Sequence, residues 1–316
     1  MSTRTDVAPL AEPKRRRWTW QAPDSTVGRA QERLAWLLVA PSIAIVLIVA
    51  IYPLIESFRL SLTNTRLASA REPRYIGLDN YRNLFEDSLF RTAIKNTLYF
   101  TFTSVAIELV LGVIIALVIN SNFKGRGLVR TSMLIPWAIP TVVSALMWQW
   151  MFNDVYGVIN DLLQYRIGII DEKVAWLSNT STAMAAIIAV DVWKTTPFMA
   201  LLLLAGLQII PGDVYEAATV DGASKWQQFW QITLPLLRPA LLVALIFRSM
   251  DAFRIFDAIY VMKSYAPDTM SIAIFTQQTL IGIGRLGEGS AAAVVIFLSI
   301  GIMVILYTRL VRVEEA

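Results

Sequence analysis

The sequence contains no cysteine and no histidine among its 316 residues. These absences exclude disulfides, thiolate nucleophiles, metal sites built from Cys or His, and imidazole acid–base chemistry. Charged residues are also scarce, at 16% of the chain, whereas hydrophobic residues make up 56%. Soluble domains carry about a quarter of charged residues. The composition therefore predicts an integral membrane protein whose fold is all-α.

The net charge of +4 and the pI near 9.3 do not indicate a nucleic-acid partner, because the basic residues concentrate at the edges of apolar segments. Residues 1–33 include Lys14–Arg17 and several Ser, Thr and Pro, without the apolar core and cleavage site of a signal peptide. We expect a basic, flexible cytoplasmic tail over residues 1–33 and a short C-terminal tail over residues 313–316.

Six apolar segments are long enough to cross a bilayer, although each alone would also suit a buried helix of a soluble protein. The first, Leu34–Ile55, has no charge and would be about 33 Å long as a helix. Pro136 and Pro140 predict a kink in the third. The six expected transmembrane helices cover 34–55, 96–123, 131–153, 182–207, 239–262 and 289–308, within a membrane domain of residues 34–312.

The orientation follows from Lys and Arg in the short connections. The N-terminal tail carries seven basic residues and the 120–130 turn carries three, so both ends and the 208–238 connection are expected in the cytoplasm. The 56–95 connection argues against this, because it also holds seven basic residues, accompanied by five acidic ones. Its residues 75–85 suit either a short amphipathic helix at the outer interface or a packed loop.

A polar, helix-prone segment, residues 211–235, separates the fourth and fifth apolar segments. Asp213 followed by Glu216 has the spacing of a capping box, and Gly222 is expected to interrupt the helix. Trp226, Phe229 and Trp230 would then share one face of a second helix that ends before Pro235. On these grounds alone, an ordinary helical hairpin and a docking loop remain equally plausible.

Charges lie inside the fourth and fifth apolar segments, where a lipid-facing position would cost roughly 2.5–3.5 kcal/mol. Asp191 and Lys194 are expected to pair within the fourth segment. In the fifth, Arg248, Asp251, Arg254 and Asp257 alternate in sign at steps of three, so that each neutralises the next on a helix. Structural ion pairing and ligand contact are both open for each of them.

The 211–235 segment resembles the EAA loop of permease subunits in ABC importers, through Glu216-Ala-Ala-x-x-Asp221-Gly222-Ala223 and the trailing Ile-x-Leu-Pro. The "GLDNYRNLF" and "NTLYFT" phrases in the 77–102 region are similar to sugar-type permeases. In that family the loop docks into a groove on the ATP-hydrolysing partner. The resemblance thus implies ATPase coupling by Glu216, Ala217, Ala218, Asp221, Gly222 and Ala223.

"VWKTTPF" at Val192 and "FRSMDAFRIFDAIYVM" at Phe247 resemble the segments that carry the sugar site in maltose- and trehalose-type permeases. Carboxylates and guanidinium groups suit sugar hydroxyls, and an aromatic ring suits an apolar sugar face. One departure is Met262–Thr269, which stands where such permeases commonly have a glycine-rich turn. The positions that match sugar-contacting ones are Asp191, Thr195, Phe198, Arg248, Asp251, Ala252 and Ile255.

The resemblance implies a non-catalytic permease subunit of a bacterial, inner-membrane ABC importer for a di- or oligosaccharide, of the maltose or trehalose type. No P-loop sequence is present, so ATP and Mg²⁺ are expected on a partner and no cofactor on this chain. The implied partners are a second permease subunit, two nucleotide-binding ATPase subunits, an extracytoplasmic sugar-binding protein and membrane lipid.

Two alternatives belong to other classes. An ion-coupled secondary transporter would use the intramembrane carboxylates of Asp191 and Asp257, and it predicts transport by this chain without an ATPase. A polytopic membrane enzyme would need catalytic Asp or Glu residues, but no pair of carboxylates in a loop has a suitable spacing. A purified chain that turned over a substrate alone would favour that enzyme.

Overall fold

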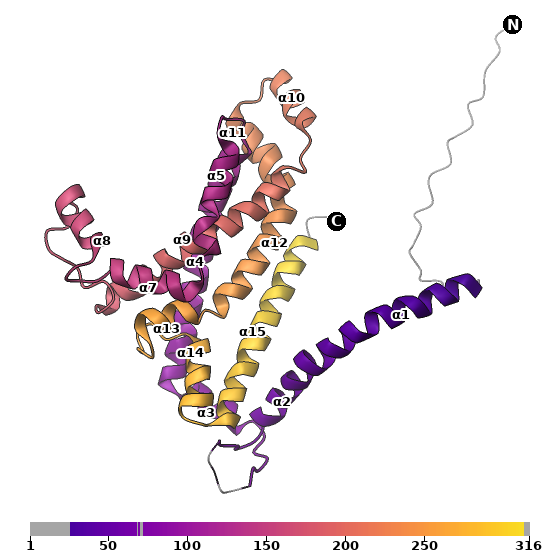
Figure 1. Cartoon of the computed structure of the whole chain (residues 1–316), viewed down its shortest axis with the longest axis vertical. Coiled ribbons are helices and arrows are strands. Elements are labelled where there is room, and N and C mark those ends of the chain that lie inside the picture. The colour runs from indigo at the N-terminus through magenta and orange to yellow at the C-terminus, as the bar shows by residue number, and fades with distance from the viewer. Residues whose placement is uncertain (1–25, 68, 70–71, 313–316) are drawn as a thin grey trace. The chain divides into compact units, whose positions relative to one another are not determined.

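The computed structural model describes residues 26–67, 69 and 72–312, which form helices and one isolated antiparallel bridge between Thr63 and Tyr75. The chain divides into two units, residues 1–55 and 56–316 (Figure 1). Of the two expected tails, residues 1–25 and 313–316 lie outside the part of the chain that the structure describes. Residues 26–33, which we expected in the N-terminal tail, are already helical.

The first unit is one long apolar helix. It comprises α1 (Thr26–Val46), a π-helical turn (Leu47–Ile51) and the beginning of α2 (Tyr52–Ser61). The stretch Gln31–Ser61 is long and apolar enough to span a membrane, and large apolar side chains such as Leu37 and Val49 are exposed along it. An apolar surface of this kind suits a lipid environment.

The second unit is built around α9 (Thr180–Leu207), which is apolar on all sides and buries most of its length. It packs along α4 (Ser88–Asn120), and α12 (Leu234–Phe253) contacts both (Figure 1). Helix α15 (Leu286–Arg312) is a further candidate span of this unit. Over both units, the described residues contain five helices that are long and apolar enough to cross a membrane, or six if one bent pair of helices forms a single span. The shorter elements of the second unit include α3 (Asp79–Glu86), α8 (Val158–Asp161), α13 (Asp257–Lys263), α14 (Ile272–Gln277) and the π-helical turns Leu162–Ile167, Phe229–Thr233 and Gln278–Gly282.

The third expected span is a bent pair of helical segments. Its first half consists of α5 (Arg126–Met133) and α6 (Ile135–Ala138), and its second half is α7 (Thr141–Met151). The two halves meet at 89°, with Ile139 and Pro140 at the break. Proline removes a backbone donor and disfavours helix in the residue before it. The predicted kink is therefore present at Pro140, as a near right angle.

The fifth expected span, residues 239–262, has different limits in the structure. Helix is continuous from α11 (Lys225–Gln228) through the π-helical turn at Phe229–Thr233 into α12, so the second helix of the 211–235 segment does not end before Pro235. Pro235 lies in the first turn of α12, where its missing N–H is not needed. The helix breaks at residues 254–256, after which α13 begins.

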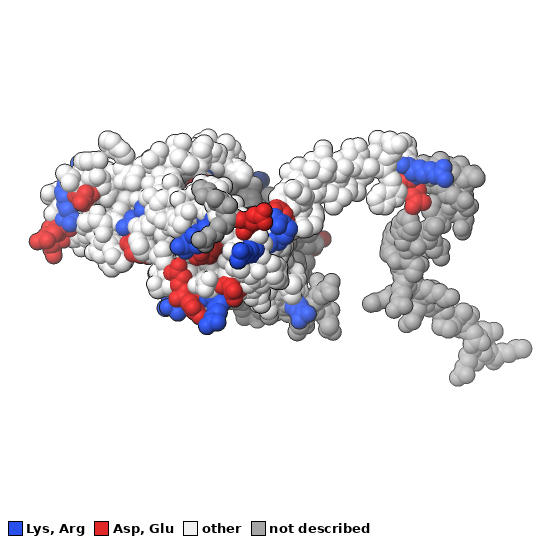
Figure 2. All heavy atoms as spheres, turned by 90° about the horizontal axis from the view of Figure 1, so that it is seen from below, with Lys and Arg blue, Asp and Glu red and all other residues white. Residues whose placement is uncertain are grey.

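The 56–95 connection contains a short helix, α3, packed into the unit. Asn80 is buried and its Nδ2 donates to the carbonyls of Ser61 and Thr63 at 2.7 and 2.8 Å, while Leu84 is fully buried. Leu78 and Phe85 instead are exposed. Figure 2 shows acidic and basic side chains side by side on this face of the unit, which agrees with exposed ion pairs such as Arg82–Glu86.

Helices α9 and α12 approach closely at Gly206. A Cβ on Gly206 would lie 2.3 Å from Cβ of Ala240 and 3.0 Å from Cδ1 of Leu237. Since Ala240 has no flexible atoms that can move aside, only glycine fits between these two helices without displacing one of them.

We predict that Gly206→Ala destabilises the helix pair by roughly 1–3 kcal/mol, because the added methyl forces α9 and α12 apart. Thermal unfolding of the detergent-purified protein, followed by size-exclusion chromatography, measures this. Gly301→Ala in α15 is the matched control, since nothing lies within 4 Å of its added Cβ. Equal melting temperatures for the two variants would contradict the close packing.

Candidate functional site

A cluster of charged side chains joins the three central helices. Glu108 comes from α4, Asp191 from α9 and Arg248 from α12, and the three side chains are 0%, 7% and 3% exposed. The guanidinium of Arg248 binds Glu108 with two nitrogens, Nε to Oε2 and Nη2 to Oε1, and Nη2 also donates to Oδ2 of Asp191. Such a bidentate arrangement is the strongest form of charge-assisted hydrogen bond.

Two further side chains complete this charged cluster. Oγ1 of Thr195 lies 2.8 Å from Oε1 of Glu108 and 2.6 Å from the carbonyl oxygen of Asp191, so its hydroxyl donates to either acceptor. Nη1 of Arg248 lies 3.2 Å from Oδ2 of Asp251, whose side chain is 70% exposed. Arg248 thus forms ion pairs with three carboxylates, of which two are buried and one is exposed.

Sequence reasoning missed Glu108 as a site residue. It is the single charge of the second apolar segment, residues 96–123, and such a charge requires a partner inside the protein. That rule was the available signal. Because the partner Arg248 lies 140 residues away, local spacing does not identify it.

Lys194 does not pair with Asp191, so that prediction was wrong. Its Nζ instead donates to the carbonyl oxygens of Trp137 and Ile139, at 3.3 and 2.7 Å. These carbonyls lie at the break between α6 and α7, where the interrupted helix leaves acceptors without an intrahelical partner. Lys194 therefore stabilises the bent span, and Asp191 is left to Arg248.

The predicted alternating stripe on the fifth span is also wrong beyond Asp251. Helix α12 ends at Phe253, so Arg254 and Asp257 are not on one continuous helix with Arg248. Nε of Arg254 donates to the Met250 carbonyl at 3.2 Å, and within the described chain no ion pair joins Arg254 to Asp251 or Asp257. Only the first step of the stripe, Arg248 to Asp251, is an ion pair.

The other predicted sugar-contact residues have unequal access. Phe198 is half-buried and stacks on Trp137, with ring centroids 5.7 Å apart and planes 11° from parallel. Ala252 is fully buried and Ile255 is packed against the main apolar core. The structure thus brings Asp191, Thr195, Arg248 and Asp251 together, and Ala252 offers no surface to a ligand.

The 211–235 segment forms two helices joined by a tight bend. Helix α10 (Gly212–Val220) ends before Gly222, whose φ of +81° is strained for any residue with a Cβ. The predicted capping box at Asp213 is absent, because Pro211 is the N-cap and no side chain caps α10. A capping box forms at α11, between Ser224 and Gln227, where the chain re-enters helix.

Internal hydrogen bonds hold the two helices of the segment together. Nε2 of the buried Gln228 donates to Oγ1 of Thr219 at 3.0 Å and to the carbonyl of Ala223 at 3.2 Å. The hydroxyls of Tyr215 and Thr233 lie 3.0 Å apart. The rings of Trp226, Phe229 and Trp230 contact one another, as the spacing predicted.

The predicted coupling residues line the outside of α10 and its bend. Glu216, Ala217, Asp221 and Gly222 are exposed, whereas Ala218 and Ala223 are half-buried. Within the described part of the chain neither acidic side chain forms an ion pair, and the apolar Val220 beside them is 88% exposed. A rigid hairpin with free carboxylates and an exposed apolar side chain is a surface suited to a protein partner.

Residues 108–313 match the family described as "Binding-protein-dependent transport system inner membrane component". The chain is 42% identical over 284 residues to the trehalose/maltose transport system permease protein MalF of Thermococcus litoralis, covering 89% of this chain and 95% of that protein. It is 40% identical over 281 residues to the trehalose transport system permease protein SugA of Mycobacterium tuberculosis, covering 89% of each.

Solved structures give the same result for the fold. A crystal structure of a bacterial ABC transporter that imports the acidic polysaccharide alginate matches 90% of this chain and 96% of its own, with a TM-score of 0.78 and 26% identity. A second structure of an alginate transporter, in complex with an alginate pentasaccharide-bound periplasmic protein, has a TM-score of 0.79, 25% identity and coverage of 90% and 95%. The expected all-α membrane fold is confirmed.

We predict that Glu108→Ala destabilises the protein by roughly 3–5 kcal/mol, because it leaves the buried guanidinium of Arg248 undercompensated. Thermal unfolding of the purified protein measures the loss. Asp251→Asn is the control: it removes the open carboxylate of the same cluster and should cost at most about 1 kcal/mol. If Glu108→Ala unfolds at the wild-type temperature, the charged cluster does not hold the helices together.

Proposed function

This chain belongs to the family of inner membrane components of binding-protein-dependent transport systems, and from that premise we propose that it translocates a disaccharide or short oligosaccharide of the trehalose or maltose type. It is a multi-pass permease subunit of an ABC importer. The substrate class is supported by the relatives that are 40–42% identical, which are trehalose or trehalose/maltose permeases. The observation that most directly supports the proposal is the charged cluster inside the membrane helices, in which the carboxylate of Asp251 is exposed.

The partners follow from what this chain does not provide. ATP and Mg²⁺ are bound by two separate nucleotide-binding subunits, because the sequence has no P-loop, and this subunit binds no cofactor and is not an enzyme. A second permease subunit completes the translocation path, and an extracytoplasmic sugar-binding protein delivers the substrate. Membership of this family favours the ABC importer over both alternatives, which are an ion-coupled transporter that uses Asp191 and Asp257 as coupling carboxylates and a membrane enzyme.

The 211–235 segment docks on the ATPase subunit. Glu216, Asp221 and Val220 present free carboxylates and an apolar side chain on a hairpin held rigid by Gln228. When the ATPase subunits close, the hairpin moves as one body. Since α9 and α12 adjoin its two ends, they then switch a shared cavity between inward-open and outward-open states.

The substrate contacts Asp251 first among the predicted residues. Its side chain is 70% exposed and its Oδ2 lies 3.2 Å from Nη1 of Arg248, so the carboxylate can accept hydrogen bonds from sugar hydroxyls. Phe198 and Ile255, which are half-buried, offer apolar contact at the edge. Asp191 and Arg248 are buried and support the site through Thr195 and the charged cluster, and Ala252 contributes packing alone.

Both chain ends lie in the cytoplasm in this proposal. The segment that docks on the cytoplasmic ATPase follows the C-terminal end of α9 and precedes α12. The basic 120–130 turn, with Lys124, Arg126 and Arg130, then lies on the same side, in agreement with the excess of positive charge in cytoplasmic loops. The exposed apolar side chains of the long helices contact membrane lipid.

We predict that Gly222→Ala lowers sugar-stimulated ATP hydrolysis by the reconstituted importer and the recovery of the ATPase subunit with this chain. The left-handed backbone costs an alanine roughly 1–2 kcal/mol, so the bend between α10 and α11 opens. Gly212→Ala is the matched control, since neither added Cβ meets an atom within 4 Å and only Gly222 has positive φ. Normal coupling in Gly222→Ala and in Glu216→Ala would exclude the docking role.

We predict that Asp251→Asn lowers sugar uptake about tenfold, the effect of losing one charge-assisted hydrogen bond, while the protein stays folded and its ATPase subunit stays bound. Uptake of radiolabelled trehalose or maltose into proteoliposomes, with sugar-loaded binding protein present, measures this. Asp257→Asn, an exposed carboxylate on α13 outside the charged cluster, is the control. Equal uptake by both variants would remove Asp251 from the substrate path.

A further inference from the structure

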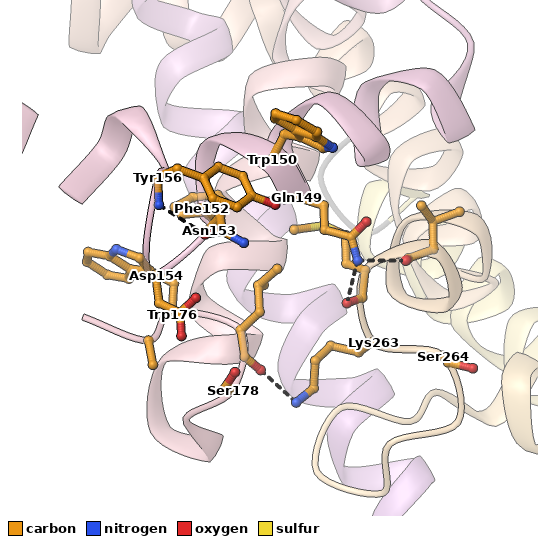
Figure 3. A pocket seen from close by; sticks show the side chains of 14 residues that line it. Gln149, Trp150, Phe152, Asn153, Asp154, Tyr156, Trp176, Ser178, Lys263 and Ser264 are labelled. Atoms are coloured by element: carbon orange, nitrogen blue, oxygen red, sulfur yellow. Dashed lines mark hydrogen bonds between the residues drawn. The ribbon is translucent and has the colours of Figure 1, made fainter. Parts of the chain in front are cut away.

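A pocket of about 570 Å³ opens at the end of the second unit where α7 ends and α9 begins (Figure 3). Its walls come from the end of α7, the 152–156 turn, residues 175–178 ahead of α9 and the end of α13. The 211–235 segment follows the opposite end of α9, about 42 Å away for a straight helix of 28 residues. If that segment is cytoplasmic, the pocket faces the outside.

Aromatic rings form one side of this outer pocket. Trp150 and Tyr156 lie together with ring centroids 5.1 Å apart, and they are 68% and 57% exposed (Figure 3). Exposed rings of this kind offer flat apolar faces at small entropic cost. The apolar face of a pyranose ring can pack on such a flat ring surface.

Polar groups that lack partners complete the pocket. The carboxylate of Asp154 and the hydroxyls of Tyr156 and Ser178 make no hydrogen bond to any residue that the structure describes. Other polar groups are already used: Nε2 of Gln149 donates to the Val261 and Met262 carbonyls, and Nζ of Lys263 donates to the Leu177 carbonyl at 2.7 Å (Figure 3). The outer pocket thus has fixed walls and free hydrogen-bonding groups.

The backbone at the edge of the outer pocket is unusual. Ser264 ends α13 with φ of 55°, and among the described residues it is the one non-glycine residue with positive φ. Backbone strain of this kind concentrates at functional sites. It lies in the Met262–Thr269 turn, the stretch where this chain departs from the glycine-rich pattern.

A row of ring contacts connects the outer pocket to the charged cluster. Trp176 contacts Phe152 with centroids 5.9 Å apart, Phe152 contacts Trp148 at 5.6 Å, and Trp148 contacts Trp193 at 5.3 Å. Trp193 lies on α9 between Asp191 and Thr195. The wall of the outer pocket is therefore packed, through Trp148, onto the helix that carries the intramembrane site.

We propose that the outer pocket is a second carbohydrate site, which holds one pyranose ring between Trp150 and the Asp154 carboxylate on the outer face of the permease. This inference rests on the proposed function, because it places the pocket on the path by which a delivered sugar enters. It extends that function with a binding site outside the membrane-spanning cluster. Pocket volumes of about 300–1,000 Å³ are those of small-molecule sites, so a pyranose fits.

The test is saturation-transfer difference NMR on the complete importer in nanodiscs, with trehalose and maltose as probes and without the binding protein. The Asp251→Asn background weakens the proposed intramembrane contact about tenfold, so that the outer pocket contributes most of the remaining signal. In that background we expect a sugar signal whose affinity falls about tenfold in Asp154→Asn and in Trp150→Ala, each removing one side of the outer pocket. Glu172→Gln, a nearby exposed carboxylate outside the pocket, should leave the affinity unchanged.

Three outcomes overturn the proposal. The first is a sugar signal in the Asp251→Asn background that none of the pocket variants changes, and the second is no signal there although the wild-type importer takes up sugar. The third is an equal loss of affinity for sugar-free binding protein in Asp154→Asn, which would make the pocket a protein-docking surface. In all three the importer still transports sugar, whereas failure of the proposed function would abolish uptake of both probes in the wild type.

Discussion

The guanidinium of Arg248 is the point on which the membrane core depends. It binds Glu108 of α4 and Asp191 of α9 from its own position on α12, and these partners are 140 and 57 residues away in sequence. A lone arginine at this depth would cost roughly 2.5–3.5 kcal/mol, and removal of one partner would leave a buried charge unpaired. Because three helices meet on one planar group with five donors, none of them can shift without moving the other two.

The same helices frame the 211–235 segment, which gives the charged cluster a mechanical connection to it. Helix α9 ends at Leu207 and is joined to α10 by the non-helical residues 208–211, whereas helix is continuous from α11 into α12, so the hairpin adjoins both helices that contribute to the charged cluster. The contacts of Gln228 with Thr219 and of Tyr215 with Thr233 keep the hairpin from deforming internally. In the proposed function, a displacement of the hairpin is transmitted to α12 through continuous helix.

Local features of the chain were predictable, and pairings between distant segments were not. The length of the apolar segments predicted the spans, Pro140 predicted the break in the third span, and Gly222 predicted the bend after α10. Each of these features depends only on neighbouring residues. The partner of Glu108 and the contact of Lys194 with the Ile139 carbonyl depend on which helices pack together, which spacing does not encode. The 89° angle at the break is likewise not encoded by local spacing, and the carbonyl exposed there accepts a hydrogen bond from Lys194 on another helix.

Net stability does not account for a charged cluster in a membrane core, since replacing a buried ion pair by apolar residues is often neutral or stabilising. What the charged cluster supplies is orientation. Asp251 is held by Arg248 on one side and is open on the other, so its carboxylate already points outward before a ligand arrives. In the proposed substrate contact, binding then costs little side-chain entropy at Asp251. The buried carboxylates of Glu108 and Asp191 provide this preorganisation because they fix the arginine that orients the exposed one.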